Sequence, residues 1–324
     1  MTPSFTIAIP VFERVFGFEE ALQSAIAVKG CKEILVVDDV SSHTEFMQIC
    51  AAKKDPRVRY IENAENLGLF GNWNQCVRLA TGDFISILCS DDVIDPNIFT
   101  WFQDAYHQMP DLDVFFGSFA VFKNSLEEAR EVFSYPAGPY SSQKLLEDAA
   151  ERGAWFPVLS VIRKEKLLEF PFVAKPHSGN DSLWVFSNAS HFKFFAHSRP
   201  LSFWRRHPNQ DAKISASITT DCWPLQYVEI SNQLRKFGSK KAGRAYNRAI
   251  GVILSWLLND KNREGHWHRR LLGSEAADNP FLYKAKSIID QNWLLSGLIS
   301  ARIMRPFYYN IGRVCRKLKI YPAA

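Results

Sequence analysis

Short apolar runs alternate with amphipathic segments through the first third of the chain. The runs predict buried strands at Phe5–Pro10, Glu33–Val37, Val58–Ile61 and Phe84–Leu88. The segments between them carry apolar residues at helical spacing and predict helices at Phe18–Val28, Thr44–Lys53 and Asn72–Ala80. Strands that alternate with helices form a mostly parallel sheet flanked by helices, so the sequence predicts a protein of the α/β class.

The remaining chain has a less regular pattern. We expect helices at Ile98–Met109 and Asn180–Ser187, strands at Val114–Phe122 and Val158–Ile162, and irregular chain at Leu126–Tyr140. From Pro224 onward the pattern is helical, including Leu225–Leu234 and Ala249–Leu258. We therefore predict a main domain at residues 1–215, with halves 1–110 and 111–215, and a helical C-terminal region at residues 216–324.

The composition indicates a globular protein with an uneven charge. The 324 residues are 47% hydrophobic, which excludes the disordered, collagen-like and disulfide-scaffold classes. The net charge of +5 is unevenly distributed along the chain. The segment from Arg235 to the end contains 18 Lys and Arg but only five Asp and Glu. A basic C-terminal region favours an anionic partner, either a membrane surface or nucleic acid.

The last basic segment is amphipathic. Phe307–Leu318 carries aromatic and aliphatic residues on one helical face. Arg313, Arg316 and Lys317, together with Lys319 just beyond the segment, fall largely on the other face. This pattern is typical of a helix that lies on an anionic membrane surface. The alternative is a helix that packs on the main domain with a solvated basic face. Nucleic-acid binding is disfavoured, because no recognised reading module accompanies the charge.

The cysteines and the apolar segments indicate the compartment. Six cysteines are scattered without a CxxC pair, and the N-terminus lacks the features of a secretory signal. The apolar stretch Trp293–Ala301 is shorter than the ~20 residues that span a bilayer. We expect reduced thiols and a cytoplasmic protein, peripheral on the cytoplasmic face of the membrane.

Acidic pairs follow two of the predicted strands directly. Asp38-Asp39 ends one strand, and Ser90-Asp91-Asp92 ends another. The carboxyl ends of parallel strands meet at one edge of a sheet, where ligands bind. Adjacent carboxylates repel each other unless a cation lies beside them, so the pairs favour a hard metal ion such as Mg²⁺ or Mn²⁺. The alternative is that these aspartates only cap helices.

Other common sites are disfavoured by missing motifs. The chain contains neither a GxGxxG after its first strand nor a GxxxxGK[ST], which argues against a dinucleotide-binding dehydrogenase and a P-loop enzyme. It contains no HExxH, and His266 and His268 have no carboxylate or cysteine at ligand spacing, so a zinc site is not expected.

Five motifs in order resemble the family 2 glycosyltransferases of GT-A fold. The resemblance covers roughly the first 210 residues and is specific because the motifs occur together. They are Ile7–Arg14, Ile34–Ser41, Asn66–Gly68, Ala80–Ile85 and Leu88–Asp92.

The resemblance implies roles for residues of the nucleotide half. Asp39 would accept hydrogen bonds from uracil, Asp91 would touch the ribose, and Asp92 would coordinate the Mn²⁺ or Mg²⁺ that bridges the diphosphate. Phe12 would stack on the base where the family usually has Tyr. The implied nucleotide-binding residues are Pro10, Phe12, Glu13, Asp39, Asn66, Gly68, Ser90 and Asp91.

The resemblance also implies roles in the second half. Asp181, in Gly179–Trp184, would be the general base, with a plain helix cap as the alternative. Phe203–His207 is similar to the family's Y-R-x-H segment, so Arg205 would contact the diphosphate and His207 would approach the metal, unless the segment is a surface turn. Two positions depart from the family: Glu13 replaces the usual Asn, and Ser41 replaces the usual Gly.

These residues together predict an inverting glycosyltransferase. It would move a single sugar from a nucleotide donor, UDP by resemblance, to a glycan or lipid-linked acceptor in bacterial surface polysaccharide or lipopolysaccharide synthesis. The processive Q-x-x-R-W signature is absent. The alternative is a catalytically silent GT-A module that binds a nucleotide sugar or serves as an assembly subunit. A sugar-nucleotide pyrophosphorylase is disfavoured, because Pro10–Glu13 is not its Gly-rich loop.

Overall fold

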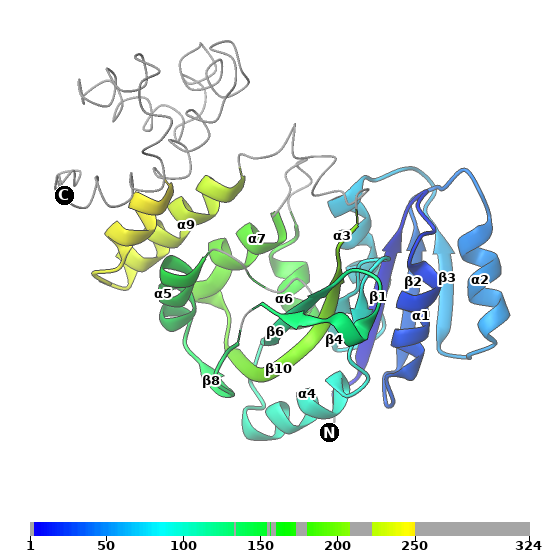
Figure 1. Cartoon of the computed structure of the whole chain (residues 1–324), viewed down its shortest axis with the longest axis horizontal. Helices are drawn as coiled ribbons and strands as arrows, with labels where there is room; N and C mark the ends of the chain where they lie inside the picture. Colours follow the sequence, from blue (N-terminus) through cyan, green and yellow to red (C-terminus); the bar gives the residue numbers. More distant parts are fainter. Residues whose placement is uncertain are drawn as a thin grey trace, which may run out of the picture. The chain divides into compact units, whose positions relative to one another are not determined.

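The computed structural model describes residues 3–132, 134–153, 156, 160–172, 180–207 and 222–249 (Figure 1). The chain forms two compact units, one of Met1–Leu145 with Trp155–Thr220 and one of Leu146–Ala154 with Asp221–Ala324. The predicted boundary between residues 215 and 216, the segments Trp293–Ala301 and Phe307–Leu318, and all but the first residue of Ala249–Leu258 lie outside the described residues.

The first unit is built on a mixed sheet whose first four strands are parallel. They lie in the order β3 (Val58–Glu62), β2 (Glu33–Asp38), β1 (Phe5–Val11) and β4 (Phe84–Ile87). Every residue of β1, β2 and β4 is buried, as the apolar runs predicted. The connecting helices are α1 (Phe18–Ala27), α2 (Glu45–Lys53) and α3 (Leu69–Leu79). The predicted α/β class is confirmed.

The second half of the sheet mixes both directions. β9 (Val161–Arg163) lies antiparallel between β4 and β6 (Val114–Phe122), and β10 (Phe194–Arg205) lies parallel to β6. The sheet ends with β5 (Val93–Ile94), antiparallel to β10. The other described elements of this unit are α4 (Ile98–Gln108), β7 (Arg130–Glu131), β8 (Gly138–Tyr140), α6 (Lys164–Glu169) and α7 (Asn180–Asn188), with 3₁₀ turns at Leu126–Glu128 and Ala189–His191.

Several elements differ from the sequence-based prediction, including β5 and α6, which were not predicted. The long strand β10 was not predicted, because the polar Ser198 and Arg199 interrupt its apolar pattern and the register with β6 shifts around Pro200. Helix α5 (Ser142–Arg152) was not predicted either. The segment Leu126–Tyr140, expected to be irregular, contains a 3₁₀ turn and two short strands.

Aromatic side chains fill the core between the sheet and α4. The rings of Phe5 and Phe99 stack with their centroids 5.6 Å apart, and those of Phe84 and Phe102 lie 4.7 Å apart. Phe5, Phe84 and Phe102 are fully buried. This core holds the strands of the nucleotide half in place beneath the candidate site.

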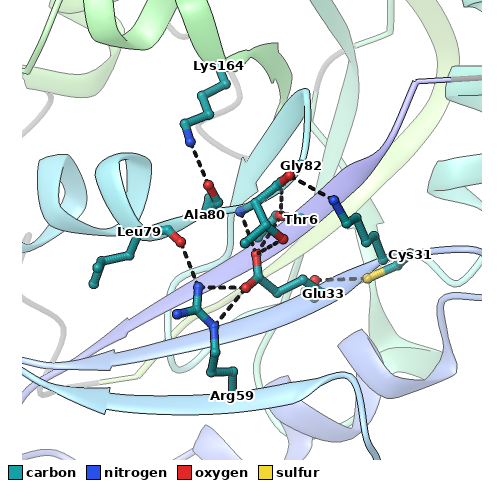
Figure 2. A network of polar contacts seen from close by, with 10 residues as sticks. Thr6, Cys31, Glu33, Arg59, Leu79, Ala80, Gly82 and Lys164 are labelled. Carbon is teal, nitrogen blue, oxygen red and sulfur yellow. Dashed lines mark hydrogen bonds and ion pairs between the residues drawn. The ribbon is translucent and has the colours of Figure 1, made fainter.

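A buried carboxylate ties together the amino ends of the parallel strands, opposite to the edge where their acidic pairs lie (Figure 2). Glu33 accepts hydrogen bonds from the Thr6 hydroxyl at 2.9 Å and the Thr81 backbone N–H at 2.8 Å, and it pairs with Arg59. Burial by itself raises the pKa of Glu33, but these hydrogen bonds outweigh it and hold the pKa below its usual value. The motif Ala80–Ile85 therefore serves to join α3 to β1 and β2.

The second unit is described over the end of α5, over α9 (Cys222–Lys236) and over helical residues 242–249. Lys241 forms ion pairs of 3.1 Å with both Glu147 and Glu151, and Arg244 lies 2.8 Å from Glu151. The acidic face of α5 thus anchors the basic segment after α9. Among the helices that the structure describes, none is long and apolar enough to cross a membrane.

Candidate active site

The two acidic pairs lie on either side of β1 at the carboxyl edge of the sheet. Val11 at the end of β1 is in register with Asp38 of β2, and the Asp39 N–H donates to the Val11 carbonyl at 3.0 Å. On the other side, the Leu88 N–H that follows β4 donates to the Ala8 carbonyl at 2.8 Å, just before the second pair. The structure therefore brings Asp39, Asp91 and Asp92 to one edge, as the strand pattern predicted.

The aspartates of the first pair have different partners. Asp38 accepts hydrogen bonds from the Ser41 and Tyr60 hydroxyls at 2.6 and 2.7 Å, so both of its oxygens stabilise the fold. Asp39 is 2% exposed, and its Oδ1 accepts from Asn63 at 2.9 Å and from the Leu67 N–H at 2.8 Å. No donor among the described residues contacts Asp39 Oδ2, which remains available for a ligand.

Asn66 and Gly68 shape the wall beside Asp39. The Asn66 amide donates to the Asp39 carbonyl at 3.0 Å, and the Gly68 N–H donates to Asn66 Oδ1 at 3.1 Å. Gly68 precedes α3 with a φ of 71°, a backbone conformation that favours glycine. These two predicted nucleotide-binding residues thus hold the turn that encloses Asp39.

The segment after β1 provides one exposed aromatic ring, and one carboxylate that connects this segment to the loop after β2. Phe12 is 49% exposed at the end of β1, while Pro10 is buried within the strand. Glu13 accepts from the Ser42 hydroxyl at 2.8 Å and the Ser42 N–H at 3.0 Å, and these bonds lower the pKa of Glu13. Glu13 therefore joins the loops after β1 and β2, whereas the Phe12 ring is free to stack on a base.

The second pair is surrounded by basic side chains. Asp91 is 7% exposed, and its Oδ2 lies 2.8 Å from His207 Nε2 and 3.6 Å from the Arg14 guanidinium. Ser90, immediately before it, is half-buried. Burial and the charge of Asp91 raise the pKa of Asp92 well above its usual value. A cation beside Asp92 would stabilise its ionised carboxylate and so lower this pKa.

The acidic pair leaves one carboxylate oxygen free for a divalent metal ion. Asp92 Oδ1 accepts the Arg205 backbone N–H at 2.9 Å, while Oδ2 has no donor among the described residues. In the part of the chain that the structure describes, no group of three or more His, Cys, Asp or Glu side chains is arranged to hold a metal ion. Mg²⁺ is commonly bound by one or two carboxylates together with substrate phosphates. A single free carboxylate oxygen is consistent with that mode.

Arg205 is placed differently from the prediction. The residue is 5% exposed, its Nε donates to the Asp91 carbonyl at 2.9 Å, and its guanidinium pairs with Glu20 of α1. The guanidinium also lies over the ring of Phe122, 4.5 Å from its centroid. These contacts indicate that Arg205 positions the acidic pair. They support this role more than the predicted contact of Arg205 with the diphosphate.

Asp181 lies in the first turn of α7 at the edge of an apolar pocket. Its Oδ1 accepts the Ser182 N–H at 2.7 Å. Burial raises the pKa of Asp181 to about 6. A carboxyl group with this pKa is ionised at neutral pH and can take up a proton, as a general base must. The described residues that line the pocket are Trp73, Ile85, Ile87, Phe156, Ile162, Leu167, Phe172, Asp181, Trp184 and Val185.

Sequence reasoning missed four residues of this site. Arg14 and Gly17, just before α1, lie against Asp91, Glu20 of α1 pairs with Arg205, and Trp73 of α3 lines the pocket of Asp181. Gly17 had a visible signal, because a glycine immediately before a helix indicates a special backbone conformation. The partners of the other three are distant in sequence, so no local pattern indicates them.

Replacement of Gly17 by Ala is expected to lower both thermal stability and nucleotide binding. Gly17 has a φ of 86°, and a Cβ there would lie 2.9 Å from Asp91 Cα. Unfavourable φ costs about 1 kcal/mol, and the backbone of the acidic loop must also move. Gly238→Ala is the matched control, since Gly238 has a φ of 66° with nothing within 4 Å. Thermal melting and UDP titration should show a larger loss for Gly17→Ala in both measurements, and equal losses would contradict the contact with Asp91.

Comparisons with known proteins indicate the family of the chain. Residues 6–166 match the model of the family described as glycosyl transferase family 2. The chain is 30% identical over 148 residues to the putative colanic acid biosynthesis glycosyl transferase WcaA of Escherichia coli, covering 43% of this chain and 51% of WcaA. It is 34% identical over 96 residues to the succinoglycan biosynthesis protein ExoO of Rhizobium meliloti, covering 29% and 27%. The matches thus span about half the length of these relatives or less.

Solved structures share the fold. The crystal structure of TarS residues 1–349 from S. aureus in complex with UDP superposes with a TM-score of 0.62 at 14% sequence identity, covering 96% of this chain and 87% of that chain. Its complex with UDP-GlcNAc gives a TM-score of 0.59 at 13% identity with the same coverage. The architecture is that of a GT-A protein, and through the domain at residues 6–166 the chain belongs to glycosyl transferase family 2.

Proposed function

We propose that the protein transfers a single sugar, with inversion, from a UDP-sugar donor to a hydroxyl group of a glycan or lipid-linked acceptor. The acceptor would belong to a bacterial surface polysaccharide or lipopolysaccharide. The observation that carries the proposal is the shared carboxyl edge, where Asp39 and the pair Asp91-Asp92 lie on either side of β1. Support for the donor comes from the UDP and UDP-GlcNAc complexes of TarS, and support for the pathway class from WcaA and ExoO.

The donor would bind along this edge with its base beside Asp39. Phe12 offers an exposed ring for stacking, and Asp39 Oδ2 can accept an N–H of the base. Asp91, which contacts His207 and Arg14, would contact the ribose. Arg205 and Glu20 keep the acidic loop against α1. A Mn²⁺ or Mg²⁺ ion beside Asp92, when bound, would neutralise the diphosphate leaving group.

Asp181 would act as the general base of a single displacement. The carboxylate takes the proton of the acceptor hydroxyl while that oxygen forms a bond to the anomeric carbon. The bond between the anomeric carbon and the diphosphate oxygen breaks, and UDP leaves with its electron pair. Attack opposite to the leaving group inverts the configuration. The apolar walls around Asp181 keep water away from the carboxylate.

The remaining partners are part of the same proposal. A lipid-linked acceptor would bring the protein to the cytoplasmic face of the membrane, where the basic C-terminal region would contact anionic lipid. The segment that would make this contact, Phe307–Leu318, lies outside the described residues.

Release of nucleotide from a panel of donors tests the proposal. The full chain is incubated with UDP-, dTDP- and GDP-sugars in Mn²⁺, Mg²⁺ or EDTA, with and without methyl glycosides as acceptors, and free nucleotide is measured. We expect metal-dependent release of UDP from one donor, faster with an acceptor. No release of nucleotide from any donor, together with undetectable nucleotide binding, would favour the catalytically silent module instead.

A further inference from the structure

Glu13 holds the loop after β1 against the loop after β2. Its N–H donates to the Ser41 hydroxyl at 2.9 Å, and its carbonyl oxygen lies 2.8 Å from His43 Nε2. Its carboxylate oxygens accept the N–H and the hydroxyl of Ser42 at 3.0 and 2.8 Å. Each polar atom of Glu13 therefore has a partner in the second loop. We call these contacts of Glu13 the loop clasp.

The second loop is itself fixed to the core through His43. The Glu45 N–H donates to His43 Nδ1 at 3.3 Å, so Nε2 carries the ring proton that the Glu13 carbonyl accepts. The His43 ring packs on Phe46 with 5.2 Å between centroids, and Phe46 packs edge-on against Phe18 of α1 at 4.9 Å. Both phenylalanines are fully buried. The loop clasp therefore joins the loop after β1 to an anchored partner.

Each loop contains a residue in the left-handed backbone region. Glu13 has a φ of 53° and Val40 a φ of 66°. Residues other than glycine rarely adopt such angles, and a β-branched residue is exceptional there. The Arg14 N–H donates to the Phe12 carbonyl, which closes a three-residue turn with Glu13 at its centre. These conformations persist only where surrounding contacts hold them, and they cluster at functional sites.

The two left-handed residues adjoin the two proposed contacts with the base. Phe12 is the first residue of the turn centred on Glu13, and Asp39 directly precedes Val40. The direction of a side chain depends on the backbone that carries it. Asp39 is also held by a hydrogen bond from the Leu67 N–H at 2.8 Å. The loop clasp therefore decides how the exposed Phe12 ring is directed relative to an already fixed Asp39.

We propose that Glu13 is a positioning residue of the donor site, which holds the Phe12 ring and Asp39 at the separation that the base of the donor requires. The inference rests on the proposed function, since it concerns the same base site. It replaces the direct nucleotide contact that the resemblance implies for Glu13. A site that is formed before the donor arrives binds more tightly, because the donor need not order the loop.

Glu13→Ala removes the carboxylate half of the loop clasp. We expect the affinity for UDP, titrated in EDTA, to fall about 10-fold, because the loop is then less often in its binding conformation. The KM for the donor should rise while kcat stays the same, since only uniform binding is lost. Thermal melting checks that the variant is folded.

Asp83→Ala is the matched control at the opposite edge of the sheet. Asp83 accepts the N–H and the hydroxyl of Ser4 at 2.8 and 2.7 Å, so this variant breaks the same kind of contact away from the donor site. Its affinity for UDP should equal that of the wild type. If Asp83→Ala loses as much affinity as Glu13→Ala, the loss reflects general loosening of the fold and the inference is wrong.

Ser42→Ala separates positioning from direct contact with the nucleotide. It removes one partner of the Glu13 carboxylate, so UDP affinity should fall a few-fold in the wild type and no further in Glu13→Ala. Glu13→Gln should retain most of the affinity, because its amide can accept the Ser42 N–H and donate to the hydroxyl. Unchanged affinity in Glu13→Ala, or independent effects of the two alanine substitutions, overturns the inference. Absence of UDP binding by the wild type would instead overturn the proposed function.

Discussion

Asp181→Asn is expected to lower the rate of sugar transfer by about 10²-fold or more while UDP binding stays intact. Removal of a general base costs about 10²- to 10⁴-fold, and the asparagine amide cannot take up the proton of the acceptor hydroxyl. The fold should survive, because the asparagine Oδ1 can accept the Ser182 N–H as Asp181 does at 2.7 Å. Single-turnover transfer and calorimetric titration with UDP measure the two quantities separately.

The pH dependence of transfer gives a second check on the same residue. Burial raises the pKa of Asp181 to about 6, and only the ionised carboxylate can act as a base. The wild-type rate should therefore rise with pH through about 6 and then level off. Asp181→Asn should lose this rise in any residual activity.

The stability of the folded protein should change with pH in the direction opposite to the transfer rate. The pKa of Asp181 is higher in the folded chain than in the unfolded chain, so the group favours the folded state at low pH and loses that contribution as pH rises through about 6. Asp181→Asn should then gain melting temperature relative to the wild type at pH 8 more than at pH 4. A variant that retains transfer, or a rate profile flat between pH 5 and 7, contradicts the role of Asp181 as the base.

The parallel half of the fold and the acidic edge could be predicted because their signals are local. A strand buried on both faces appears as an apolar run, and a carboxylate that follows such a run must lie at the carboxyl edge of the sheet. Asp39, Asp91 and Asp92 each carry that signal. The first half of the chain therefore agrees closely with its sequence-based prediction.

The remaining features depend on contacts between distant residues. Arg205 pairs with Glu20, 185 residues away in sequence, so its binding to the acidic loop has no local pattern. The orientation of Trp73 depends on Phe172, which Asn74 holds from 98 residues away. Strand β10 could not be predicted, because the shift in register around Pro200 interrupts its apolar pattern. Local periodicity predicts elements, whereas these features depend on how the elements pack.

Asp92→Asn is expected to lower metal-dependent transfer by about 10³-fold, because a metal ion at a leaving group contributes several kcal/mol to catalysis. Asparagine is the informative substitution, since its Oδ1 can still accept the Arg205 N–H that Asp92 accepts at 2.9 Å. The acidic loop should therefore keep its position, and the melting temperature should not fall. The variant loses the negative charge and the free carboxylate oxygen, which are what a divalent cation requires.

The binding of UDP tests the role of Asp92 independently of catalysis. Mn²⁺ should strengthen UDP binding by the wild type and have little effect on Asp92→Asn, and in EDTA the two proteins should bind UDP equally. Asp95→Asn is the matched control three residues further on, because Asp95 Oδ1 accepts from the Asn97 N–H at 2.8 Å and an amide oxygen can do the same. Its response to Mn²⁺ should equal that of the wild type. A wild-type enzyme whose transfer is unaffected by EDTA would remove the metal from the mechanism, and Asp92 would then act through its charge alone.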